Sequence, residues 1–348
     1  MSDQIKKLYL FNLSTDLDDP LLAFTHDWIV AAAKIVHNIE VVSTHIGRWN
    51  LPGNVRVREL GGGTFRQRVN AIFKCMEIFY EIAKCRKDVK VFYHMTNKIA
   101  SILCLPLRVI GVKQAIWYSH SANPLSLKVA SKFCDLVFSS APSSLPFSSS
   151  KCRYVGHGIN FARFPELNER EDIIRHGFVS LGRIAPIKNI EKLLDAISRS
   201  SVEEKQVDLI GPSALDANYQ QELQKFANEK KVKIYFKGPV TYADVPKTLA
   251  KYSICYTGNP NTTDKAGIES AAVGCFVITN EPGTQNLTGM TELWEKTEVD
   301  TTDLVSQIDF LLNVQTAHEI RFEISIRARE RNNVINAIEK IMTGLRDA

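Results

Sequence analysis

Strand-like and helix-like segments alternate along the whole of this 348-residue chain, and no other feature restricts its fold as strongly. Short runs rich in Val, Ile, Phe and Tyr are followed by longer segments whose apolar residues recur three and four positions apart. This alternation predicts parallel sheets covered by helices on both faces. The expected strands are residues 8–13, 40–44, 89–93, 114–118 and 136–139, and then 177–181, 206–210, 232–236, 253–257 and 275–279.

The chain is long enough for two domains that each bury a core. The two series of strands predict a doubly wound, Rossmann-like α/β domain over residues 1–160 and another over 161–330, with a helix in 331–348 packing back on the first. The seven cysteines form no C-x-x-C pair, which predicts reduced thiols and no bound metal. Apolar runs stay shorter than the roughly 18 residues of a membrane span, so we expect a cytoplasmic protein.

Positive charge is concentrated in the first half. Residues 1–160 contain 20 Lys and Arg against 11 Asp and Glu, whereas the whole chain has a net charge of only +5. This excess predicts an anionic partner for the first half, such as a membrane surface, an anionic lipid carrier or nucleic acid. Residues 65–87 mix apolar and cationic side chains at helical spacing, which fits either a helix at the inner face of a membrane or a helix packed between domains.

A short cationic turn follows the first strand of the second half. The strand ends at Gly182, Arg183 comes next, and Lys188 stands five positions later, just before a helical pattern. Two cations at the carboxyl end of a strand, where α/β proteins bind ligands, suit a diphosphate. The segment matches neither a P-loop nor a dinucleotide fingerprint. The alternative is a pair of solvated surface cations.

A second segment, residues 264–279, begins with an acid at a helix start and continues through small residues to a Gly and an apolar strand. This pattern is typical of a helix held closely against a sheet. The free N–H groups at the N-terminus of such a helix can bind an anion, and a carboxylate in its first turns, such as Glu269, can accept both hydroxyls of a ribose. The alternative is ordinary packing with Glu269 at the surface.

Together, the turn from Gly182 to Lys188 and the run from Glu269 to Ile278 resemble the retaining glycosyltransferases of the GT-B fold, in the large group 1 (family 4) type that includes sucrose synthase and bacterial mannosyltransferases. The resemblance covers the second half well and the first half loosely. It implies two Rossmann-like domains facing a central cleft, the first binding the acceptor and the second the donor. It also implies metal-independent hexosyl transfer from a UDP- or GDP-sugar, with no further cofactor.

The implied acceptor is a saccharide or a lipid-linked saccharide, in polysaccharide, lipopolysaccharide or glycolipid synthesis. The resemblance also assigns residues. Arg183 and Lys188, with Gly182 in the same turn, match the catalytic groups that hold the donor diphosphate. Glu269 matches the carboxylate that binds the donor ribose. His120, at the end of a strand, matches a histidine that faces the transferred sugar, and a purely structural histidine is the alternative.

Two further segments match by position. Pro239 and Val240, in the loop after the strand at 232–236, match backbone that holds the nucleobase. Residues 156–160 resemble the run that ends the first domain, with Asn160 in place of the usual Asp.

The sequence also departs from the family pattern. Asn261 stands where the first glutamate of a pair is expected, so Asp264 or a backbone group is expected to contact the sugar hydroxyls, with Lys265 adding a cation near the phosphates. The identity of the donor sugar is therefore open.

The loop after the first strand lacks the Gly-rich turn of many relatives. Ser14, Thr15 and Asp16 are expected to line the acceptor side instead. Asp16-x-Asp18 also has the form of the metal-binding motif of the other glycosyltransferase fold, although that motif belongs in the middle of a single domain.

Two other functions fit parts of the sequence. A nucleotide-sugar epimerase on the same fold would convert the donor without an acceptor. A nucleic-acid-binding protein would use the basic first half, but the sequence has no RNP-like strand, zinc finger or helix-turn-helix pattern.

Overall fold

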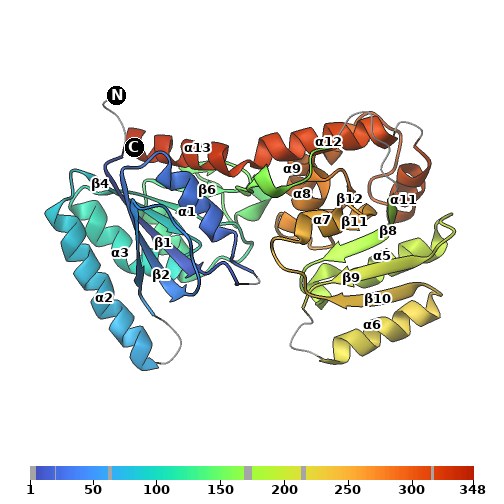
Figure 1. Ribbon diagram of the computed structural model, residues 1–348, viewed down its shortest axis with the longest axis horizontal. Helices are drawn as coiled ribbons and strands as arrows, with labels where there is room; N and C mark the ends of the chain where they lie inside the picture. Colours follow the sequence, from blue (N-terminus) through green and yellow to red (C-terminus); the bar gives the residue numbers. More distant parts are fainter. Residues whose placement is uncertain (1–4, 20, 62–64, 168–174, 213–216, 315–316) are drawn as a thin grey trace. The chain divides into compact units, whose positions relative to one another are not determined.

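The computed structural model describes residues 5–19, 21–61, 65–167, 175–212, 217–314 and 317–348 (Figure 1). It divides into two compact units, residues 1–160 with 332–348 and residues 161–331. Each unit contains one sheet in which every described strand pair is parallel. The α/β class predicted from the alternation is therefore confirmed.

The first unit has a seven-stranded sheet in the order β3-β2-β1-β4-β5-β6-β7. The chain runs outward from β1 to one edge, returns to the middle and runs to the other edge, which is the doubly wound order. Its elements are β1 (Lys7–Thr15), α1 (Thr25–Ala33), β2 (Asn38–Ile46), β3 (Val55–Glu59), α2 (Phe65–Lys84), β4 (Val89–His94), α3 (Asn97–Val109), β5 (Lys113–Trp117), α4 (Leu125–Phe133), β6 (Leu136–Ser139), η1 (Pro142–Ser144), β7 (Cys152–Tyr154) and α13 (Val334–Asp347).

Both faces of this sheet are buried, and successive residues of β1 show how. Leu8 and Leu10 point into a core shared with α1 and α13, whereas Tyr9 and Phe11 point into a core shared with α2, α3 and α4. The C-terminal helix α13 contributes buried side chains such as Ile341 to the first of these cores, and it lies along the sheet of the first unit (Figure 1).

The second unit repeats this plan with five strands, in the order β10-β9-β8-β11-β12. Further helices follow β12 and complete the unit. The elements are η2 (Phe161–Arg163), β8 (His176–Leu181), η3 (Pro186–Lys188), α5 (Ile190–Arg199), β9 (Gln206–Ile210), α6 (Ala217–Glu229), β10 (Lys233–Gly238), α7 (Val245–Leu249), β11 (Tyr252–Tyr256), α8 (Lys265–Ala272), β12 (Phe276–Ile278), α9 (Pro282–Thr288), α10 (Met290–Trp294), α11 (Leu304–Asn313) and α12 (Ala317–Asn332). Among the described helices of both units, none is long and apolar enough to cross a membrane.

An aromatic cluster lies at the carboxyl ends of β4 and β5 in the first unit. The ring of His94 stacks on Trp117 with centroids 5.0 Å apart and lies 4.6 Å from the ring of Trp28. Trp28 Nε1 donates to the carbonyl oxygen of Gly158 at 2.8 Å, and Gly158 has a φ of +64°. A Cβ at this glycine would lie 2.4 Å from the indole, so the close approach requires glycine.

Burial within this cluster lowers the pKa of His94 from 6.5 to about 3. Between about pH 6.5 and about pH 3, the unfolded chain therefore binds a proton at His94 that the folded unit does not bind. The stability that the neutral ring contributes to the folded unit is present above pH 6.5 and is lost as the pH falls. The histidine ring accordingly stays neutral in the folded protein at physiological pH.

We expect the pH dependence of stability to weaken when His94 is replaced by Phe. Between pH 7 and pH 5, this histidine alone should lower the unfolding free energy of the wild type by about 2 kcal/mol. The unfolding free energy of His94→Phe should therefore fall by about 2 kcal/mol less than that of the wild type over the same pH range. Urea unfolding followed by tryptophan fluorescence measures the difference, with the exposed His37→Phe as the matched control. Equal pH dependence in the wild type and His94→Phe would contradict the assignment.

Candidate functional site

The predicted cationic turn lies at the carboxyl end of β8, the central strand of the five-stranded sheet. Gly182 follows the strand with a φ of +126°, a region that favours glycine. The strands on both sides also end at this edge because all five are parallel, so the segments after β8, β10 and β11 meet there. This edge is where open α/β sheets bind ligands.

Lys188 lies close above Gly182 and is held by an acid. A Cβ at Gly182 would come within 3.4 Å of the Lys188 ammonium nitrogen, so the lysine covers the turn. Its ammonium forms an ion pair with Asp264, and both side chains are largely buried, at 14% and 10% exposure. Arg183 is exposed, and among the described residues it has no ion-pair or hydrogen-bond partner. Of the two predicted phosphate-binding cations, one is therefore engaged and the other is open to solvent.

Asp264 is also the N-cap of α8. Its Oδ1 accepts a hydrogen bond from the Ala266 N–H at 3.1 Å, and its own N–H donates to the Thr284 hydroxyl at 2.9 Å. The carboxylate thus lies between the Lys188 ammonium and the N-terminus of α8. Asn261, three residues earlier, is exposed, and its N–H donates to the Asn259 side chain at 3.2 Å.

The side chain of Glu269 lies almost fully buried one turn into α8. Lys265 Nζ donates to its Oε1 at 2.6 Å, and an Arg163 Nη2 lies 3.7 Å from the same oxygen. The guanidinium of Arg163 stacks on the Tyr242 ring at 3.4 Å, and Lys265 lies over that ring at 4.6 Å. Two cations that contact the same aromatic ring thus also contact the same carboxylate.

Arg163 and Tyr242 were not predicted from the sequence. Arg163 lies in η2 directly after the first unit, and it also donates to the Tyr242 carbonyl oxygen at 2.6 Å. Neither residue belongs to a motif with a characteristic spacing, so only their contacts with Glu269 place them in this site.

The loop with Pro239 and Val240 follows β10 at the same edge of the sheet, with Pro239 exposed and Val240 half-buried.

The described site contains four cations and two carboxylates, which leaves an excess of two positive charges. Such a balance suits a ligand with two negative charges, the charge of a diphosphate diester. These cations are Arg163, Arg183, Lys188 and Lys265, and the carboxylates are Asp264 and Glu269.

In the first unit, the predicted acceptor-side residues lie where β1 ends. Ser14 and Thr15 are buried, and the Thr15 hydroxyl lies 2.5 Å from the Ser43 hydroxyl. Asp16 accepts hydrogen bonds from the backbone N–H groups of Arg48 and Asp18, at 3.1 and 3.0 Å. This loop is thus tied to the segment after β2 by the Asp16 carboxylate.

Asp18, the second acid of the apparent metal motif, is paired with an arginine. The Arg48 guanidinium donates to both carboxylate oxygens, at 2.6 and 2.9 Å, and this contact lowers the pKa of Asp18. The two acids of the motif therefore have separate partners in the described structure.

His120 lies beyond the end of β5, exposed, and its Nδ1 accepts a hydrogen bond from the Ala122 N–H at 2.9 Å. Because Nδ1 accepts this hydrogen bond, Nε2 is the ring nitrogen that remains available to a ligand. His120 shares the carboxyl edge of the seven-stranded sheet with residues 14–16.

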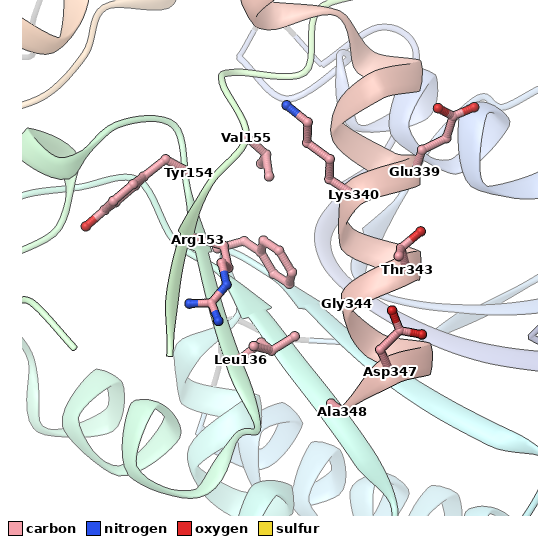
Figure 2. Close-up of a pocket in the computed structure, with 11 residues that line it drawn as sticks. Leu136, Arg153, Tyr154, Val155, Glu339, Lys340, Thr343, Gly344, Asp347 and Ala348 are labelled. Carbon is pink, nitrogen blue, oxygen red and sulfur yellow. The ribbon is translucent and has the colours of Figure 1, made fainter. Parts of the chain in front are cut away.

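A cavity of about 680 Å³ lies elsewhere in the first unit, between strand β6, the edge strand β7 and helix α13. Figure 2 shows Leu136 and Val155 among its apolar lining and Arg153, Lys340 and Asp347 among its charged lining. None of the predicted site residues lines this cavity. It is therefore separate from the candidate site in both sequence and location.

Comparison with known proteins relates the chain by structure rather than by sequence. No protein-family model matches it, and no curated protein matches its sequence. Solved structures that do match include HepE of Anabaena (Alr3699) in complex with UDP and glucose, at 13% identity and a TM-score of 0.71 over 99% of this chain and 100% of that one. A glycosyltransferase of Rickettsia africae matches at 13% identity with a TM-score of 0.70, covering 98% of each chain.

The lipopolysaccharide outer core galactosyltransferase WaaB also matches, at 10% identity with a TM-score of 0.66 over 97% of this chain and 98% of that one. All three likenesses extend over nearly the whole of both chains, so they include both units. The chain therefore has the two-domain GT-B fold of these glycosyltransferases.

Proposed function

We propose that this protein is a glycosyltransferase that moves a sugar from a nucleoside-diphosphate sugar to a saccharide or lipid-linked acceptor. The observation that carries the proposal is the meeting of the Gly182–Lys188 turn with the start of α8 at one sheet edge. Cations suited to a diphosphate and a buried carboxylate suited to ribose hydroxyls occur there together, on a fold shared with glycosyltransferases.

UDP is the proposed nucleotide, because HepE has been crystallised with UDP and with UDP-glucose. In this account Glu269 accepts hydrogen bonds from the ribose hydroxyls, and Arg163, Tyr242 and Lys265 hold its carboxylate in place. The backbone after β10 would hold the base.

The proposed reaction needs charge stabilisation at the leaving group. The acceptor hydroxyl oxygen forms a bond to the anomeric carbon while the bond from that carbon to the diphosphate oxygen breaks. The electron pair goes to the diphosphate, and the acceptor proton ends on a phosphate oxygen. In this proposal Arg183 and Lys188 stabilise the developing negative charge, the role of preorganised electrostatic groups. Retention of configuration, metal independence and a sugar-facing role for His120 rest on the family resemblance.

The exposed face of helix α2 supports the proposal that the acceptor is associated with a membrane. Four apolar side chains on its outer face are about half exposed or more: Ile72, Phe73, Met76 and Tyr80. Met76 follows Ile72 and Phe73 by four and three residues, and Tyr80 follows Met76 by four, which places the four side chains in one stripe. Exposed cations lie at the C-terminal end of the stripe, and Lys84 Nζ lies 4.3 Å from the Tyr80 ring centroid. Such a combination fits the headgroup region of an anionic membrane, where each cation contributes roughly 1 kcal/mol.

The role of the cationic turn is tested by Arg183→Ala and Lys188→Ala. Each variant should lower kcat with a UDP-sugar by roughly 100-fold, corresponding to about 3 kcal/mol of activation free energy. Lys192→Ala, an exposed cation on the following helix α5, is the matched control and should keep wild-type turnover.

The measurement is release of nucleoside diphosphate and of glycosylated product, with and without acceptor. Near-normal turnover in both variants would contradict the proposed role. Conversion of the donor to an epimer without acceptor would instead assign the site to an epimerase.

The membrane proposal is tested by the double variant Phe73→Ser/Tyr80→Ser. We expect the wild type to sediment with phosphatidylglycerol vesicles and not with phosphatidylcholine vesicles, and the variant to lose most of this binding. Leu125→Ser removes an exposed apolar side chain of α4 outside the stripe and should leave binding unchanged. Wild-type protein that stays in solution with anionic vesicles, or a double variant that binds as well as wild type, would contradict the proposal.

A further inference from the structure

The ion pair between Lys188 and Asp264 places an anion of the protein itself in the diphosphate site. One carboxylate oxygen contacts the lysine ammonium, and the other accepts the Ala266 N–H at the start of α8. A lysine ammonium and the free N–H groups of a helix start are the two kinds of group that bind a phosphate. Asp264 thus occupies the position that an anionic ligand of Lys188 would take.

We propose that Asp264 competes with the donor diphosphate for Lys188 and thereby limits how tightly the site holds a nucleoside diphosphate. This inference rests on the proposed function, because it requires the diphosphate to bind at the turn. Without its carboxylate partner, Lys188 would be a largely buried cation with no charge to balance it, which is unfavourable. The pair therefore stabilises the empty site, and the ligand must break it or share the lysine with it.

The consequence is greatest for the product. A nucleoside diphosphate has one more ionisable oxygen than the sugar diphosphate from which it forms, so the cations of the site would hold the product more strongly than the donor. A carboxylate that returns to Lys188 opposes this retention. Asp264 acts here as a positioning residue for Lys188 and needs no contact with the sugar.

The test uses Asp264→Asn in the full-length protein, because asparagine caps a helix as well as aspartate does and removes only the charge. Isothermal titration with UDP should give a dissociation constant about tenfold lower than that of the wild type, the factor that 1.4 kcal/mol produces. Uridine, which has no phosphate, should bind equally to both proteins. Asp303→Asn changes the N-cap of α11 in the same way and serves as the control, with UDP affinity unchanged.

The double variant Asp264→Asn/Lys188→Gln shows whether the competition acts through the lysine. In the Lys188→Gln background, the Asp264→Asn change should increase the affinity for UDP by much less than tenfold. A gain of equal size in both backgrounds, an equal gain for uridine, or no gain for UDP would overturn the inference. If the wild type itself fails to bind UDP and other nucleoside diphosphates, the proposed function fails instead.

Discussion

Parallel pairing of every described strand is the constraint on which the rest of the structure depends. Each connection between parallel strands must return the chain to the opposite edge of the sheet, so the carboxyl ends of all the strands lie at one edge of each sheet. In the second unit this brings together the turn at Gly182, the loop after β10 and the start of α8. Residues 76 positions apart can therefore contact one another, as Lys188 and Asp264 do.

The charges at this edge are arranged in two linked groups around the first turn of α8. Asp264 holds Lys188 before the helix begins, and Lys265 holds Glu269 within it. Adjacent residues of one short segment therefore belong to different ion pairs. The second pair is buttressed by Arg163, whose position depends on its stacking with an aromatic ring. A ligand entering the site meets carboxylates that already have partners and one exposed cation, so binding there is an exchange of partners rather than a simple neutralisation.

Much of the fold follows from the sequence because its central strands are buried on both faces and form continuous apolar runs. The strand expected at 206–210 agrees with β9 at both ends. The edge strands β3 and β7 were missed, since Val55–Glu59 alternates valine with arginine and Cys152–Tyr154 has only three residues. Partly exposed, short strands do not have the apolar pattern that identifies buried ones.

The candidate site could also be predicted from the sequence only in part. Arg183, Lys188 and Glu269 could be predicted because the chemistry they suit requires particular residue types at particular spacings, and their functional roles stay predictions. The ion pair of Asp264 and the contact of Arg163 with Glu269 could not be predicted, since each joins residues far apart in sequence that share no motif. Only the three-dimensional arrangement shows that Asp264 faces a lysine.

Hydrogen exchange measured with and without nucleotide tests the central claim most directly. On addition of UDP to the full-length protein, the account predicts slower amide exchange in the turn 182–188 and at the start of α8, with an increase in unfolding free energy of about 2.7 kcal/mol at 100 times the dissociation constant. Uridine should give less protection at the turn, because it brings no phosphate to the cations. Protection confined to other parts of the chain, or none with UDP, GDP or ADP, would contradict the assignment of this edge as a nucleoside-diphosphate site.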